Sequence, residues 1–94
     1  IMYILGDIGN TETKVCIVSK KNKILKKITF LSKTINSTQL NILFKKNKIQ
    51  LNKIEKILFC SVVPNTFKKI KKFLSKKIKV NCLEVKNLNL KSLI

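Results

Sequence analysis

Several residue types are missing from this 94-residue chain, and their absence argues against certain kinds of site. The chain has no histidine, and its three cysteines lie far apart, with no Cys-x-x-Cys pair. The sequence therefore argues against a zinc site, which needs closely spaced nitrogen and sulfur ligands. Tryptophan, alanine and arginine are also absent, so all 21 basic residues are lysines.

The cysteine usage and the lack of long apolar runs bear on where the protein acts. Cys16, Cys60 and Cys82 each fall in an expected strand, and an odd number of strand cysteines indicates reduced core thiols. No uncharged apolar run approaches the roughly 18 residues that would span a bilayer. No basic leader precedes the first apolar stretch, which argues against a signal peptide. We therefore expect a cytoplasmic protein without a membrane partner.

The charge is strongly one-sided, with a formal net charge of +17 against only four acidic residues. Such a charge suggests a partner such as nucleic acid or an anionic membrane. However, a composition rich in Lys, Ile and Asn is also what an AT-rich genome encodes, and nucleic-acid binders more often use arginine. We favour a solvated lysine surface, with a non-catalytic basic domain that binds nucleic acid or other anions as the alternative. The 45% of hydrophobic residues are enough for one core and one domain.

The first eighteen residues contain the most informative pattern. An apolar run reaches Asp7, a short polar turn follows, and a second apolar run begins, which predicts strand, turn and strand. Asp7 is the only aspartate in the chain. Gly9 suits either a close approach of the backbone to a ligand or a positive φ, and Asn10, Thr11 and Thr13 are typical of anion-binding turns. The alternative is an ordinary hairpin whose Asp7 and Asn10 side chains bond to the turn.

Periodicity and breaker residues predict the remaining elements. In the third strand, Ile24, Ile28 and Phe30 share one side of the pleat, with Lys26 on that same side. Pro64 opens an amphipathic helix, whose apolar stripe we expect to pack on the sheet while its lysines are solvated. The segment 87–94 has no clear period. Strands are expected at 2–8, 13–19, 24–31, 56–62 and 78–85, and helices at 37–47 and 64–77.

Two motifs resemble those of a known family. Asp7-Ile8-Gly9-Asn10-Thr11-Glu12-Thr13 is similar to the first phosphate motif of type III pantothenate kinases, Asp-x-Gly-Asn-Thr-x-Thr. Cys60-Ser61-Val62-Val63-Pro64 resembles the family's Ser-Ser-Val-Val-Pro, in the right order and at a plausible separation. The resemblance implies an α/β fold of the ribonuclease H-like type (actin-like sugar-kinase superfamily), with a mixed five-stranded sheet in the order β-β-β-α-β-α-β. It covers residues 1–94 as a single N-terminal ATPase-type domain, without the family's second domain.

The resemblance also implies an activity, the ATP-dependent phosphorylation of pantothenate that begins coenzyme A biosynthesis. Asp7 would hold Mg²⁺ directly or through water, and a monovalent cation is left open. Ser61 and Pro64 would border the cleft, although for Ser61 a helix-initiating turn is an equal alternative. The residues that would bind ATP and its phosphates are Asp7, Ile8, Gly9, Asn10, Thr11, Glu12, Thr13 and Lys14.

The chain departs from the family pattern in ways that limit the expected activity. The Gly-x-Asp-Arg motif, which carries the general base and part of the pantothenate site, does not occur, so no catalytic residue is assigned. Lys14 stands where the family has an apolar residue, and its role is open. The helix start is also altered, to Asn36-Ser37-Thr38-Gln39. We expect the chain alone to bind nucleotide weakly and to transfer no phosphate, and to act as part of a homodimer or with a separate C-terminal half.

Overall fold

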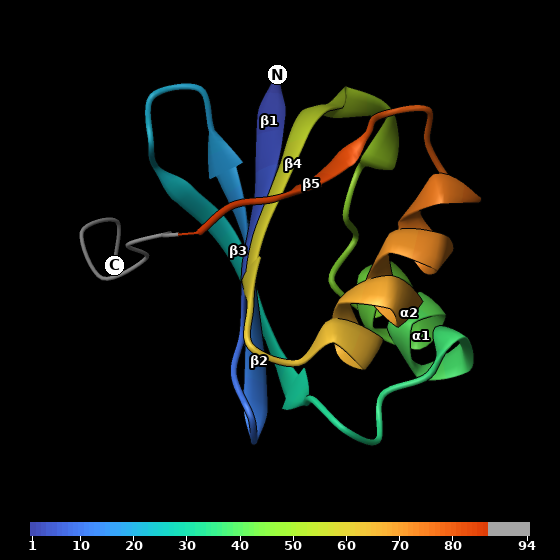
Figure 1. Ribbon diagram of the computed structural model, residues 1–94. Coiled ribbons are helices and arrows are strands. Elements are labelled where there is room, and N and C mark those ends of the chain that lie inside the picture. The colour runs from blue at the N-terminus through green and yellow to red at the C-terminus, as the bar shows by residue number, and fades with distance from the viewer. Residues whose placement is uncertain (87–94) are drawn as a thin grey trace.

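The computed structural model describes residues 1–86, so the expectation for 87–94 lies outside the described residues. In Figure 1 the strands form a sheet with the helices packed beside it. The elements in chain order are β1 (Met2–Ile8), β2 (Glu12–Ser19), β3 (Ile24–Leu31), α1 (Ser37–Lys46), a 3₁₀ turn (Leu51–Lys53), β4 (Ile54–Ser61), α2 (Pro64–Ser75) and β5 (Cys82–Glu84).

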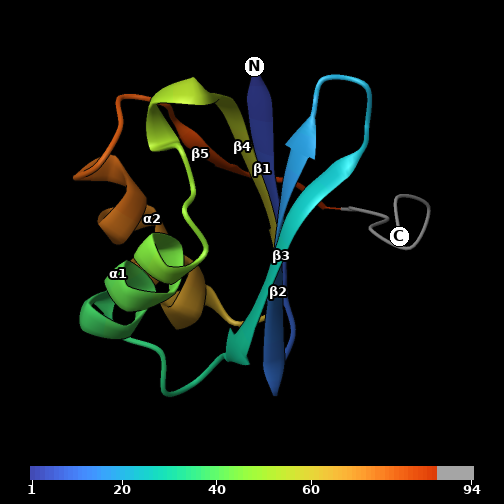
Figure 2. The same ribbon diagram turned by 180° about the vertical axis from the view of Figure 1, so that it is seen from behind.

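The sheet is mixed and has β1 at its centre. Its strand order is β3-β2-β1-β4-β5. The pairs β1–β2 and β2–β3 are antiparallel, and the pairs β1–β4 and β4–β5 are parallel. Both helices lie on the same face of the sheet, as the two opposite views in Figures 1 and 2 show. The expected α/β fold with a mixed five-stranded sheet is confirmed.

The central strand contributes to two hydrophobic clusters because its side chains alternate between the faces. Ile4 and Ile8 join the larger cluster, which lies between the sheet and the helices. Leu5 joins the smaller cluster on the opposite face, together with Cys16 and Val18. This two-sided burial explains why β1 is an almost continuous apolar run.

One expected face assignment is wrong. Ile24 packs in the smaller cluster, whereas Ile28 belongs to the larger one, so the two do not share a side of the pleat. The cause is a shift in register, because Ile17 pairs with Lys26 but the next residue, Val18, pairs with Ile24. The extra residue of this bulge places the side chain of Ile24, at the start of β3, on the opposite face of the sheet.

Some element boundaries also differ from the expectation. β4 begins at Ile54, two residues earlier than expected, and α2 ends at Ser75. The strand expected over 78–85 is reduced to Cys82–Glu84. The backbone N–H of Ile78 donates to the carbonyl of Leu74, which ties the first part of that segment to the end of the helix. Its side chain nevertheless packs on the larger cluster, which explains its apolar character.

One close contact joins β1 and β4. Gly6 pairs with Phe59, whose side chain is fully buried. A Cβ atom at Gly6 would lie 2.0 Å from the nearest Phe59 ring atom. The missing side chain of Gly6 therefore leaves the space that the ring occupies, directly before Asp7 in the chain.

We predict that Gly6→Ala destabilises the fold. Because overpacking a dense core forces its neighbours to shift, the free energy of unfolding should fall by about 1–3 kcal/mol. Urea denaturation measures this change. In a Phe59→Leu background the added methyl group should cost less, because the ring no longer fills the space. An equal cost in both backgrounds would contradict the account.

Candidate functional site

The two motifs far apart in the sequence meet at the carboxyl ends of β1 and β4. Ile8, the last residue of β1, pairs with Thr13 on β2 and with Ser61 on β4. The backbone N–H of Val62 donates to the Ile8 carbonyl at 3.0 Å. The turn after β1 and the turn after β4 are thus neighbours, at the edge of the sheet where ligands collect in α/β folds.

A row of polar residues crosses the sheet one position before this edge. Asp7 lies opposite Lys14 of β2 and Cys60 of β4, and Lys14 lies opposite Thr29 of β3. The row is on the face away from the helices, because the next residue, Ile8, packs in the helix-side cluster. Asp7, Lys14 and Thr29 are exposed, and Cys60 is half-buried. A carboxylate and an ammonium group are therefore available side by side.

The turn between β1 and β2 is short and closed by its own backbone. The N–H of Gly9 donates to the carbonyl of Glu12 at 3.0 Å, and Asn10 and Thr11 between them are exposed. A Cβ atom at Gly9 would lie only 3.0 Å from the Glu12 carbonyl oxygen. No glycine among residues 1–86 has a positive φ, so the positive-φ explanation for Gly9 is wrong. The space beside its Cα atom is limited by the turn's own backbone.

Two of the expected phosphate-binding residues lie beneath the turn. Ile8 is fully buried in the larger cluster. Thr13 is fully buried as well, and its hydroxyl bonds to the hydroxyl of Ser32 at 2.8 Å. These two side chains therefore support the turn, and the exposed ones are those of Asp7, Asn10, Thr11, Glu12 and Lys14.

Ser32 and Thr66 contact this region although sequence reasoning did not select them. The N–H of Ser32 donates to the Thr11 carbonyl at 2.9 Å, and the Thr66 hydroxyl donates to the Ser32 carbonyl at 2.7 Å. Both side chains are buried. A single serine after a strand and a threonine near a helix start carry no periodic signal. Only their burial among polar partners distinguishes them.

The second motif forms the start of α2. The Ser61 hydroxyl accepts a hydrogen bond from the Val63 N–H and donates one to the Val63 carbonyl, both at 3.0 Å. Val63 is the N-cap and Pro64 is the first helical residue. These bonds are what a helix-initiating turn requires, and they engage the Ser61 hydroxyl locally. Pro64 itself is exposed beside the turn.

The cysteines are free thiols with different surroundings. Burial raises the pKa of Cys82 to about 11, although the positive charge of Lys71 acts in the opposite direction. Burial also raises the pKa of Cys16, against the charges of Lys27 and Lys14. The half-buried Cys60, beside Asp7 in the polar row, donates from its Sγ atom to the Lys86 carbonyl at 3.3 Å.

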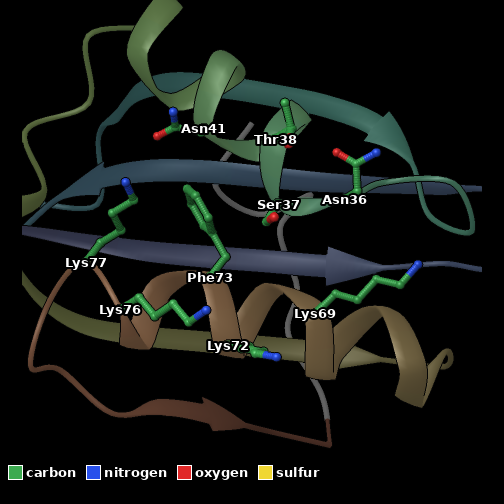
Figure 3. Close-up of a pocket in the computed structure, with 9 residues that line it drawn as sticks. All are labelled: Asn36, Ser37, Thr38, Asn41, Lys69, Lys72, Phe73, Lys76 and Lys77. Atoms are coloured by element: carbon green, nitrogen blue, oxygen red, sulfur yellow. The ribbon is translucent and has the colours of Figure 1, made fainter.

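A separate groove of about 620 Å³ lies between the two helices. Figure 3 shows lysines of α2 on one side and polar side chains at the start of α1 on the other. The Nζ atom of Lys69 donates to the Ile35 carbonyl at 3.2 Å, which ties α2 to the loop before α1. Among residues 1–86, no acidic residue lines the groove. Its lining residues are Asn36, Ser37, Thr38, Asn41, Lys69, Lys72, Phe73, Lys76 and Lys77.

Comparison with known proteins agrees with the two motifs. The family model for type III pantothenate kinase matches residues 3–94. A curated type III pantothenate kinase of Pelagibacter ubique (strain HTCC1062) is 48% identical over 93 residues. The match covers 99% of this chain but 38% of the relative's length. With the motifs placed together at one edge of the sheet and the family model matched over nearly the whole chain, the protein belongs to the type III pantothenate kinase family.

Proposed function

We propose that this chain supplies the ATP- and Mg²⁺-binding part of an enzyme that phosphorylates pantothenate. The observation that carries the proposal is the exposed Asp7, which lies opposite Lys14 and directly before the turn closed by Gly9 and Glu12. Phosphoryl transfer depends mainly on positioning and on stabilising negative charge. An acid, a cation and a short polar turn at one strand end can contribute to both.

Each exposed residue then has a role that its chemistry suits. The Gly9 N–H is engaged by the Glu12 carbonyl, and the other backbone N–H groups of the turn, with the Asn10 and Thr11 side chains, would donate to phosphate oxygens. Lys14 would add a positive charge beside them, which gives a function to its departure from the family pattern. The buried Ile8 and Thr13 would hold the turn in place. Ser61 and Pro64 would border the same cleft, because the hydrogen bond from the Val62 N–H to the Ile8 carbonyl holds their turn beside the first one.

Asp7 is a suitable ligand for magnesium. Mg²⁺ commonly binds through one or two carboxylates, keeps several waters, and takes further oxygens from the substrate's phosphates. Within residues 1–86 no three His, Cys, Asp or Glu side chains gather at one place, and Asp7 is the carboxylate that we assign to the ion. When bound, the ion neutralises charge on the phosphates. The proposed function also allows a monovalent cation to bind beside the phosphates.

The remaining parts of the reaction are assigned to protein beyond these residues. The chain spans 38% of the relative's length, and it contains no second aspartate and no arginine. We therefore propose that the general base, most of the pantothenate site and part of a homodimer contact lie in the rest of the enzyme. No helix within residues 1–86 is long and apolar enough to cross a membrane. A cytoplasmic location, where the three thiols would stay reduced, belongs to the same proposal.

Asp7→Asn should weaken Mg²⁺-dependent ATP binding by about 10–100-fold, as expected for a lost metal partner. Isothermal titration with and without Mg²⁺ measures this effect. Glu55→Gln is the matched control, since it removes another exposed carboxylate from the same sheet at the opposite end of β4. If both variants bind like the wild type, Asp7 is not the metal-positioning group.

Cys60 provides a second test because it pairs with Asp7 across β1 and β4. At pH 8.5 the raised pKa values of the buried Cys16 and Cys82 keep both as thiols, so iodoacetamide should modify Cys60 first. Mg²⁺–ATP should then slow the modification of Cys60, and it should not do so in Asp7→Asn. Peptide mass spectrometry follows each site. Equal rates with and without nucleotide would contradict this placement of the phosphates.

The groove between the helices favours one alternative, in which lysines bind an anion such as nucleic acid. Lysine-driven binding of a single-stranded oligonucleotide should weaken steeply with salt. The double variant Lys72→Gln with Lys76→Gln should make the plot of log binding constant against log salt concentration less steep, by the equivalent of about one to two phosphate contacts. Lys20→Gln with Lys21→Gln, in the β2–β3 turn, removes the same charge away from the groove. If both double variants bind equally, the groove has no special role and the surface is simply solvated.

A further inference from the structure

The buried polar residues among the described part of the chain form one connected group. Thr13, Ser32 and Thr66 are the only buried polar residues within residues 1–86, and all three side chains are 0–1% exposed. They come from β2, from the residue directly after β3 and from the first turn of α2. Buried polar groups persist where they are hydrogen-bonded, and no buried side-chain polar atom within residues 1–86 is unpaired.

Ser32 is the centre of this group because all of its polar groups have partners. Its N–H donates to the Thr11 carbonyl at 2.9 Å, and its hydroxyl bonds to the Thr13 hydroxyl at 2.8 Å. Its carbonyl accepts from the Thr66 hydroxyl at 2.7 Å. One residue therefore joins the turn after β1, the strand that leaves this turn, and the helix that begins after β4.

The bond to Thr11 fixes the direction of a peptide in the turn itself. In a planar trans peptide the carbonyl of Thr11 and the N–H of Glu12 point in opposite directions. Holding the carbonyl toward Ser32 therefore also sets the direction of the Glu12 N–H. The backbone donors of the turn are then aimed before any anion arrives, which lowers the cost of ordering them on binding.

We propose that Ser32 is a positioning residue, which couples the first turn of α2 to the turn that binds phosphate. The inference rests on the function proposed above for the turn, and it goes beyond that function by connecting it to Thr66. A disturbance at the start of α2 thus reaches the Gly9–Glu12 turn through two hydrogen bonds of Ser32. The family motifs at 7–13 and 60–64 do not include either Ser32 or Thr66.

Hydrogen exchange with NMR detection tests the coupling in the full chain without any ligand. Thr66→Val removes the bond to the Ser32 carbonyl with little change in shape. We expect amide exchange of Ser32 and Gly9 to become about tenfold faster, while the Val62 amide, which bonds to Ile8, changes much less. Ser32→Ala should have a similar effect through the loss of the Thr13 partner. Unchanged exchange at Gly9 in both variants would overturn the coupling.

A matched variant separates positioning from general loss of stability. Leu40→Val removes buried volume on α1 without removing any hydrogen bond of Ser32, and urea can bring all proteins to equal global stability. At equal stability, Thr66→Val and Ser32→Ala should still show fast exchange at Gly9, whereas Leu40→Val should not. Fast exchange at Gly9 in all three would show an ordinary structural role and would overturn the inference.

Nucleotide affinity gives the functional readout. Ser32→Ala should weaken Mg²⁺–ATP binding by about tenfold, the range seen when outer partners of a ligand site are removed. Leu40→Val should leave it unchanged. If the wild type binds and Ser32→Ala binds equally well, the positioning role is wrong. If the wild type shows no Mg²⁺-dependent binding, the proposed function fails, and exchange at Gly9 alone decides the coupling.

Discussion

The candidate site depends on the parallel pairing of β1 with β4, which places the carboxyl ends of these two strands side by side. This pairing brings the turn after Ile8 beside the turn after Ser61 and adds the bond from Val62 to Ile8. The ring of Phe59 fills the space that the missing side chain of Gly6 leaves beside this pair. A slip of one residue would turn Asp7 from the open face toward the helices, because strand side chains alternate. The register of the β1–β4 pair therefore determines both which side chains pack against the helices and which face of the sheet carries the Asp7 carboxylate.

The lysines that carry the positive charge have different surroundings. Lys56, Lys71 and Lys77 each lie over an aromatic ring, at 5.7–5.9 Å from Nζ to the ring centroid. Such lysines cover apolar surface while their ammonium groups stay in water. Lys14 has a different setting, opposite the only aspartate. With a net charge of +17, an anion bound at the carboxyl edge would also relieve repulsion between the lysines.

The sequence predicts the strands and helices well where each has a strong local pattern. The apolar runs of β1 and β4 and the proline at the start of α2 are of this kind. Ile24 was assigned to the wrong face because a bulge in the β2–β3 pair depends on tertiary packing and has no marker in the sequence. Ile78 and Val80 have the composition of a strand, but they pack on the core from irregular backbone.

In the site, too, the sequence predicts the residues of a local motif but not the features that depend on tertiary structure. The resemblance placed Asp7, Gly9 and Asn10 in one motif, and the structure puts them at one strand end beside the second motif. It could not separate the exposed Thr11 from the buried Thr13, because the direction of a side chain follows from the sheet register. Ser32 was missed for a related reason, since its partners lie in two segments distant from it in the sequence, Thr11 and Thr13 in one and Thr66 in the other.

The proposed function requires that Mg²⁺–nucleotide binds beside Asp7 at the carboxyl end of β1. Paramagnetic broadening of amide NMR signals by Mn²⁺ in the presence of ATP tests this binding site, because broadening falls steeply with distance from the ion. The signals of Gly9, Asn10, Lys14 and Cys60 should broaden first. Broadening centred on Asn36 and Lys72, in the groove between the helices, would contradict this binding site.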